Sequence, residues 1–164
     1  ESDNLCLYLR RRYTGRNFSR SRTLAGHLGL DNLIMFYDSN DIQLSTECNA
    51  VTDEDVAKKY EAWGWKVLTI NGNDADEIRE ALTAAKAVKD QPTLIIGKTV
   101  MGKGALKADK SSYERNCATH GAPLGGDAYI NTINNLGGDP ENPFQIFPEV
   151  QNCMLLVAKN LKLS

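Results

Sequence analysis

The stretch "KVLTINGNDADEIREALTAAKAVKDQPTLIIGKT", residues 66–99, decides the fold class. It opens with the apolar run KVLTI (66–70) and closes with PTLIIGKT (92–99), and both runs are typical of buried strands. Residues 74–90 between them begin with acidic residues and end with lysines, as a helix dipole favours. Their apolar residues recur at helical spacing, at Ile78, Ala81, Leu82 and Ala85. Strand, helix and strand in this order predict a βαβ unit with parallel strands.

The same alternation extends toward the N-terminus. LIMFY (33–37) is a short apolar run that ends in the turn-rich letters DSND, and it predicts another buried strand. DEDVAKKYEAWG (53–64) predicts a helix, because Thr52 and Asp55 resemble a capping box and Gly64 can end the helix. We therefore expect an α/β protein with a partial parallel sheet built of βαβ units.

The second half of the chain is less regular. Residues 101–126 are rich in Gly, Lys and Ser and predict a long loop, a type of segment that is usually functional or disordered. DAYINTINNLGG (127–138) predicts a short helix, and DPENPFQIF (139–147) predicts an extended linker. Residues 148–163 predict a terminal helix.

The composition is ordinary except in one segment. The 164 residues, of which 41% are hydrophobic and 24% charged, suffice to bury the core of one domain. The formal net charge of -2 argues against a general nucleic-acid-binding protein. The basic excess is confined to residues 10–22, which hold six arginines and no acidic residue. We therefore expect residues 1–23 to form a solvated, partly disordered basic arm.

The cysteines and histidines give no metal-binding pattern. The four cysteines are far apart and form no CxxC pair, and with only two histidines they make a poor zinc set. Free thiols in a reducing cytoplasm are the expected state. No apolar run is long enough to cross a membrane, and no signal peptide is recognised. Because the chain begins without methionine, we expect a trimmed product or a fragment.

Several segments together resemble the transketolase family, the thiamine-diphosphate enzymes that move two-carbon ketol units between sugar phosphates. The resemblance runs over about residues 24–151 and includes LAGHLGLDNLIMFYDSNDIQL (24–44), QPTLIIGKTVMGKGA (91–105) and THGAPLGGDA (119–128). It implies a thiamin-diphosphate-binding fold and the later part of the domain that holds the cofactor's diphosphate. Because the family enzyme is several times longer, we expect a fragment, divided into a basic arm (1–23), a partial cofactor-binding domain (24–147) and a C-terminal helix or linker (148–164).

The resemblance also implies a cofactor site. The family holds thiamine diphosphate through Mg²⁺ or Ca²⁺, cations that take oxygen ligands. The matching ligands are the side chain of Asn40 and the backbone carbonyl of Ile42. From the residues alone, Asn40 is a turn residue, a role that Asn and Asp favour. By resemblance, His120 contacts the cofactor and the reacting sugar and is the implied catalytic residue, and Met101 and Gly102 match the turn against the cofactor.

One family ligand has no counterpart. The Asp of the family's Gly-Asp-Gly turn falls at Arg10, and the glycine neighbours fall at Arg11 and Arg12. A guanidinium group cannot ligate a cation. Residues 6–24 can be encoded so that the reading frame one base later gives AFISDGGIQEEISQGAGR, which is the strand, turn and helix that the family carries there. We therefore hypothesise a frame slip in the gene or its sequencing, corrected near Leu24.

The resemblance bears on activity as well. The family activates its cofactor with a Glu on a pyrimidine-binding domain of the partner subunit, and the 164 residues contain no match to that domain. We therefore expect the isolated chain to be inactive, with sugar phosphates as the family substrates and a homo-oligomer or a partner chain as the expected association. Two alternatives stay open: a non-enzymatic α/β binding or interaction protein, and a pseudogene product.

Overall fold

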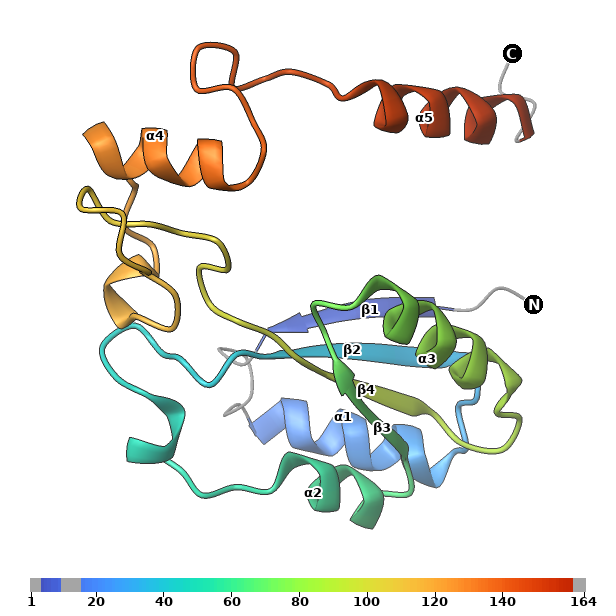
Figure 1. Ribbon diagram of the computed structural model, residues 1–164. Helices are drawn as coiled ribbons and strands as arrows, with labels where there is room; N and C mark the ends of the chain where they lie inside the picture. Colours follow the sequence, from blue (N-terminus) through green and yellow to red (C-terminus); the bar gives the residue numbers. More distant parts are fainter. Residues whose placement is uncertain (1–3, 10–15, 161–164) are drawn as a thin grey trace. The chain divides into compact units, whose positions relative to one another are not determined.

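The computed structural model describes residues 4–9 and 16–160 and contains a four-stranded sheet. The strands lie in the order β1-β2-β4-β3, and every neighbouring pair is parallel (Figure 1). Their bounds are β1 (Asn4–Leu9), β2 (Leu33–Ser39), β3 (Lys66–Asn71) and β4 (Thr93–Lys98). The α/β fold with a parallel sheet is the one that the alternating pattern predicts.

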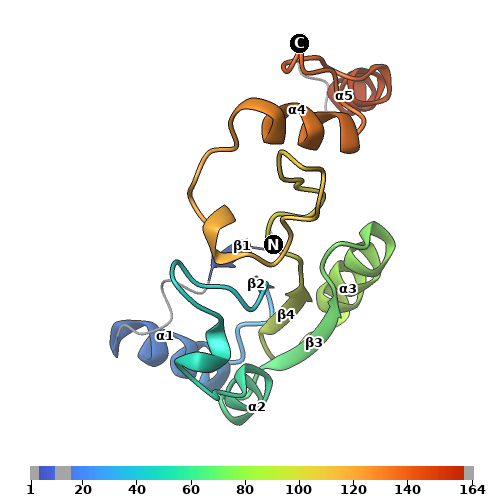
Figure 2. The ribbon, with the colours of Figure 1, turned by 60° about the vertical axis from the view of Figure 1, so that its left-hand side comes forward.

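Three helices connect the strands. The helices α1 (Arg16–His27) and α2 (Val56–Ala62) lie on one face of the sheet, and α3 (Ala75–Ala87) lies on the other (Figures 1 and 2). The connections from β1 to β2 and from β2 to β3 move across the sheet in one direction, and the connection from β3 to β4 moves back. Because such crossovers are right-handed, the reversal places α3 on the opposite face.

The strands carry two separate cores because their side chains alternate between the faces. On the face of α1 and α2, Met35 and Tyr37 pack with Leu94, Ile96, Ala25, Tyr60 and Trp65. On the face of α3, Ile34 and Ile95 pack with Ala81 and Ala85. Both faces of the sheet are therefore covered, as is usual for a parallel sheet.

Local capping sets where the connecting helices begin. The Asp74 carboxylate accepts from the backbone N–H groups of Asp76 and Glu77, so α3 begins where its acidic start predicts. The capping box expected at Thr52 is wrong. Its hydroxyl accepts from the N–H of Glu54, and Asp55 caps α2 instead by accepting from the N–H of Lys58 at 3.1 Å. The helix consequently begins three residues later than the capping box implied.

The N-terminal segment differs from the solvated arm that its arginines predicted. Residues 4–9 form β1, which pairs along its whole length with β2, and α1 begins at Arg16. The expected boundary between residues 23 and 24 therefore falls inside α1. The reason is that β1 finds hydrogen-bond partners along the edge of β2, while Gly26 lets α1 approach the C-terminal end of α2 so closely that an added Cβ would lie 1.7 Å from the Trp63 carbonyl oxygen. The run Arg10 to Arg12 lies outside the described residues.

The chain divides into two compact units. The first contains residues 1–101 and 115–121, with the sheet and two short 3-10 helices, Cys48–Ala50 and Cys117–Thr119. The second contains residues 102–114 and 122–164, with α4 (Gly126–Asn135) and α5 (Pro148–Asn160). The two helices predicted in this half are confirmed: α4 begins one residue before its predicted start and ends three residues before its predicted end, and α5 begins at the predicted Pro148.

In the second unit, three polar side chains of α4 hold a turn of the predicted loop. The hydroxyl of Thr132 accepts from the N–H of Leu106 at 2.9 Å, and the amide of Asn135 donates to the Gly104 carbonyl at 2.9 Å. The amide of Asn131 donates to the carbonyl of Lys107 at 3.0 Å. These contacts give the loop a fixed backbone path, closed by an antiparallel bridge between Leu106 and Ser112.

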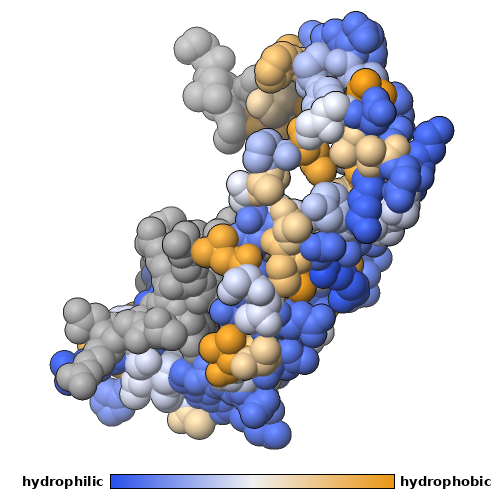
Figure 3. All heavy atoms as spheres, turned by 90° about the vertical axis from the view of Figure 1, so that its left-hand side faces the viewer, coloured by the Kyte–Doolittle hydropathy of each residue, from blue (hydrophilic) through white to orange (hydrophobic). Residues whose placement is uncertain are grey.

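The surface carries isolated apolar side chains and one apolar helix. In α5 the side chains of Val150, Met154, Leu155, Leu156 and Val157 are all exposed. The face drawn in Figure 3 is mostly hydrophilic, with hydrophobic residues in small separate groups. Among the helices that the structure describes, none has the length and apolar character needed to span a bilayer.

Candidate functional site

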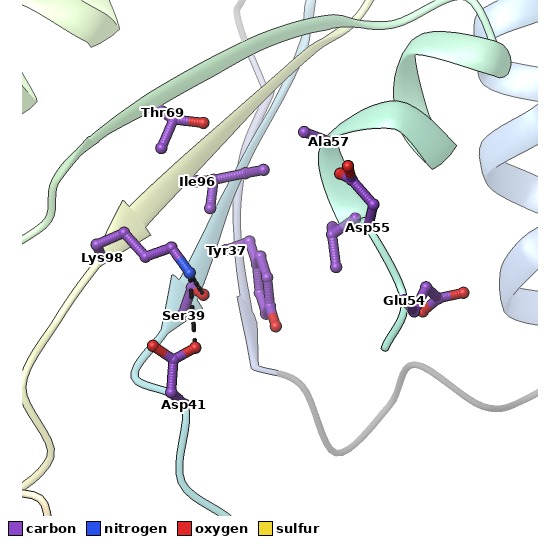
Figure 4. A pocket seen from close by; sticks show the side chains of 10 residues that line it. Tyr37, Ser39, Asp41, Glu54, Asp55, Ala57, Thr69, Ile96 and Lys98 are labelled. Carbon is purple, nitrogen blue, oxygen red and sulfur yellow. Dashed lines mark hydrogen bonds and ion pairs between the residues drawn. The ribbon is translucent and has the colours of Figure 1, made fainter. Parts of the chain in front are cut away.

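The candidate site lies where β2, β3 and β4 end. Because the strands are parallel, their last residues Ser39, Asn71 and Lys98 meet at one edge of the sheet. The chain leaves β2 toward α2 on one face and leaves β3 toward α3 on the other, and α/β proteins bind ligands at such a reversal. A pocket of about 270 Å³ opens here, and its lining includes Tyr37, Ser39, Asp41, Asp55, Ile96 and Lys98 (Figure 4).

A second pocket of about 470 Å³ shares Asp41, Thr69 and Lys98 with the first. Its own lining comes from the ends of β3 and β4, from the start of α3 and from a later loop, and includes Asn71, Asn73, Glu77, Thr99 and Arg115. The two pockets therefore flank the carboxyl end of β4, the strand between β2 and β3.

Lys98 organises the polar groups between the pockets. Its Nζ donates to the hydroxyl of Ser39 at 3.0 Å and lies 3.5 Å from a carboxylate oxygen of Asp41 (Figure 4). Asp41 has a φ of 62°, in the left-handed region that Asp tolerates better than most residues. At the rim, the N–H and ammonium groups of Lys58 lower the pKa of the Asp55 carboxyl. Among the described residues, the lining of the first pocket thus combines the Lys98 ammonium group with the carboxyl groups of Asp41, Glu54 and Asp55.

Asn40 and Ile42, the ligands that the family resemblance implies, lie in one turn after β2. The Asn40 side-chain oxygen accepts from the N–H of Ile42 at 3.1 Å, and its amide nitrogen donates to Asp38 at 3.3 Å. This is the turn role that the residues alone predict for Asn40. It leaves one lone pair on the Asn40 oxygen, because an amide oxygen has two. Within residues 4–9 and 16–160, the Ile42 carbonyl accepts no hydrogen bond.

The other implied site residues lie elsewhere. His120 is half-buried, its backbone N–H donates to the Cys117 carbonyl, and its ring Nδ1 is buried without a hydrogen-bond partner in the described part of the chain. Met101 belongs to the same unit, and its carbonyl accepts from the N–H of Arg115 at 2.9 Å. Neither residue lines the two pockets. Gly102 has a φ of 64° and begins the second unit.

The sequence analysis missed four polar residues near this edge of the sheet, namely Asp38, Lys98, Thr99 and Arg115. The first three had a usable signal, because they stand at the carboxyl ends of the predicted strands 33–37 and 92–99. Arg115 had none. Among the residues that the structure describes, no three of His, Cys, Asp and Glu gather where they could share a metal ion. Cys48, Cys117 and Cys153 are free thiols.

Residues 17–160 match the family model described as "Transketolase, thiamine diphosphate binding domain". The transketolase of Kluyveromyces lactis is 46% identical over 134 residues, which are 80% of this chain and 19% of that protein. The transketolase of Staphylococcus aureus is 41% identical over 138 residues, 81% of this chain and 20% of that protein. The chain therefore spans about a fifth of the length of these relatives.

Solved transketolase structures are also similar to this chain. A transketolase of Campylobacter jejuni superposes with a TM-score of 0.83 at 35% identity, over 92% of this chain and 23% of that one. A transketolase of Pichia stipitis, solved in complex with sedoheptulose 7-phosphate, gives a TM-score of 0.89 at 30% identity, over 99% of this chain and 24% of that one. The segment matched by the family model contains Asn40, Ile42 and His120, whereas Arg10 to Arg12 lie before it.

Proposed function

Because the chain belongs to the transketolase family, we propose that it holds the diphosphate end of thiamine diphosphate through a divalent cation, Mg²⁺ or Ca²⁺. The observation that carries the proposal is the turn of Asn40 and Ile42 at the carboxyl end of β2. This edge of a parallel sheet is where α/β proteins bind their ligands.

The oxygen atoms of Asn40 and Ile42 suit such a cation as ligands. Mg²⁺ and Ca²⁺ prefer neutral and anionic oxygen ligands, and the side-chain oxygen of Asn40 and the carbonyl of Ile42 both retain free lone pairs. The third family position is held by Arg10, which lies outside the described residues. A guanidinium there opposes a cation, so we expect weaker binding than in a variant that carries Arg10→Asp.

The proposed reaction is the transfer of a two-carbon ketol group between sugar phosphates. Thiamine diphosphate supplies the carbanion chemistry when it is bound. His120 is proposed to hydrogen-bond the cofactor and the reacting sugar, and its buried, unpartnered Nδ1 supports that role. Met101 is proposed to pack against the cofactor.

The proposal assigns turnover to the assembled protein, either as a homo-oligomer or with a partner chain that carries the pyrimidine-binding domain. The 164 residues tested alone are expected to be inactive. A cytoplasmic location and a place in the pentose phosphate pathway belong to the same proposal, and family membership supports them.

A thermal melt tests the binding step. Thiamine diphosphate with Mg²⁺, at one hundred times its dissociation constant, should stabilise the chain by about 2.7 kcal/mol, or several degrees in Tm. Asn40→Ala should abolish the cation-dependent shift, whereas Asn49→Ala, at an exposed asparagine outside both pockets, should keep it. A chain that melts cooperatively with no shift would contradict the proposal and favour a non-enzymatic α/β protein.

A further inference from the structure

We propose that Asp38 and Thr99 are positioning residues that fix the side-chain amide of Asn40, so that its oxygen rather than its nitrogen faces the cation. This inference rests on the proposed function of Asn40 as a cation ligand. It concerns two residues that make no contact with the cation themselves.

A chain of hydrogen bonds connects the end of β4 to the turn of Asn40. The hydroxyl of Thr99 donates to one carboxylate oxygen of Asp38. The other carboxylate oxygen accepts from the amide nitrogen of Asn40 at 3.3 Å. The Asn40 oxygen then accepts from the N–H of Ile42 at 3.1 Å. All the groups in this chain are partly buried, so water competes with them less than at an open surface.

The chemistry of the two ends allows only one orientation of the Asn40 amide. An ionised carboxylate only accepts hydrogen bonds, and a backbone N–H only donates them. The group facing Asp38 must therefore be the NH2, and the group facing Ile42 must be the oxygen. In the flipped orientation, the amide oxygen would face the carboxylate and the NH2 would face the Ile42 N–H, so both hydrogen bonds would be lost. A flipped amide would also turn a donor toward the place where a cation needs an acceptor.

Thr99 holds the Asp38 carboxylate in the rotation that this orientation requires. The paired register of β2 and β4 ends at Ser39 and Lys98, and the Thr99 backbone N–H continues the connection by donating to the Ser39 carbonyl at 3.3 Å. The Thr99 hydroxyl is thereby fixed next to Asp38. Without the hydroxyl, one carboxylate oxygen loses its partner and the carboxylate is free to rotate away from Asn40. Outer groups that orient a metal ligand in this way typically change metal affinity 10- to 100-fold.

The nearby pair of Lys98 and Asp41 is not assigned this role. The Asn40 amide hydrogen-bonds Asp38 and Ile42 and neither of these two side chains. Both side chains are more than half exposed, at 53% for Lys98 and 61% for Asp41. An exposed pair of this kind has little power to hold a neighbouring group.

The test measures binding of Mn²⁺ to the 164-residue chain in the presence of thiamine diphosphate, by the loss of the free-ion electron paramagnetic resonance signal beyond the loss that thiamine diphosphate causes without the chain. Thr99→Val removes the hydroxyl at nearly constant shape and should weaken Mn²⁺ binding 10- to 100-fold. Thr99→Ser keeps the hydroxyl and should restore it. Thr93→Val is the matched control, because Thr93 begins β4, the strand that Thr99 directly follows, and its buried hydroxyl has no partner in the described structure.

Asp38→Asn provides a second variant should Thr99→Val fail to fold. An asparagine at this position offers both donor and acceptor, tolerates the flipped Asn40 amide, and should also weaken Mn²⁺ binding. Wild-type affinity in both Thr99→Val and Asp38→Asn, with binding lost in Asn40→Ala, would overturn the positioning role and leave the proposed function standing. No Mn²⁺ binding by the unmodified chain, or unchanged binding in Asn40→Ala, would overturn the ligand role of Asn40 and the positioning role together.

Discussion

The indole N–H of Trp65 donates a hydrogen bond of 2.9 Å to the backbone carbonyl of Arg22. Trp65 directly precedes β3 and is 3% exposed, while Arg22 lies within α1, 43 residues earlier in the chain. Trp65 also packs in the core shared by α1 and α2. This residue therefore ties the arginine-rich segment to the folded sheet.

Trp65→Phe should loosen α1. The substitution removes the indole donor from a partly buried carbonyl and leaves a smaller ring, so we expect unfolding to become easier by at least about 1 kcal/mol. Urea unfolding measures the global effect, and amide hydrogen exchange of residues 19–27 measures the local one. Trp63→Phe is the control, because no hydrogen bond of its indole is recorded in the described structure. Equal loss of protection in both variants would contradict the role of the Trp65 hydrogen bond.

Tyr60 should make the fold sensitive to alkali. Burial raises the pKa of Tyr60 to about 12, and the nearby Arg22 guanidinium opposes the rise in part. In the unfolded chain, tyrosine titrates near pH 10. Between about pH 10 and 12 the unfolded chain therefore loses a proton that the folded chain keeps, and the free energy of unfolding falls. Urea unfolding measures this free energy from pH 8 to 12. It should fall less in Tyr60→Phe than in the unmodified chain, whereas the control Tyr129→Phe should show the same fall as the unmodified chain.

Thr93→Val should stabilise the chain. Thr93 is fully buried at the start of β4, and its hydroxyl has no hydrogen-bond partner in the part of the chain that the structure describes. Replacing the hydroxyl with a methyl group of similar size removes an unmet polar group, which is worth about 1 kcal/mol. Thermal and urea unfolding check the result. A loss of stability would show that the hydroxyl has a partner, such as a bound water molecule.

Thr132→Val should release the turn that α4 holds. The Thr132 hydroxyl both accepts from the N–H of Leu106 and donates to its carbonyl, and the residue is 7% exposed. Leaving these backbone groups without a partner costs about 1–3 kcal/mol locally. Hydrogen exchange of residues 104–108 should quicken in Thr132→Val and stay slow in Thr132→Ser. Unchanged hydrogen exchange in Thr132→Val would contradict this role and show that the hydrogen bonds of Asn131 and Asn135 are enough to hold the turn.

The frame-slip hypothesis has its own measurement. Sequencing of the source DNA should show an insertion or deletion near the codons for Cys6 and Leu24, with the family-like strand, turn and helix in the shifted frame. A single uninterrupted frame that encodes Arg10 to Arg12 in the organism would exclude a sequencing error and leave an ancient slip as the remaining explanation.

The elements with local signals could be predicted from the sequence. The helix expected over 74–90 is observed at Ala75–Ala87, because its cap, charges and apolar stripe all lie within its own residues. The same holds for the strands at 66–70 and 92–99. The basic segment could not be predicted in this way. Its structure depends on pairing with an edge of β2 and on the hydrogen bond from Trp65, and both are distant in sequence, whereas its arginine-rich composition by itself favours a solvated arm.

In the candidate site too, the local features could be predicted from the sequence and the long-range contacts could not. The turn of Asn40 is made by a neighbour two residues away and follows from residue type. The contact of Thr99 with Asp38 spans 61 residues and exists only because β2 and β4 are paired in register. No propensity or spacing rule reports such a register, so the sequence can place Thr99 and Asp38 at strand ends but cannot predict the hydrogen bond between them.

The position of β4 in the sheet has a consequence for the order in which the chain folds. Of the four described strands it is the last to be synthesised, yet it lies between β2 and β3. Within the described part of the chain β3 pairs with β4 alone, so its partner strand has not yet been made when β3 leaves the ribosome. The pairing of Ile34 with Thr93 also closes roughly twice the length of chain that the pairing of Lys66 with Thr93 closes. Short-range closure is faster, so β3, α3 and β4 should form one nucleus before β4 pairs with β2. The strands β1 and β2, which are synthesised earlier, would form a separate pair and join this nucleus in the final step.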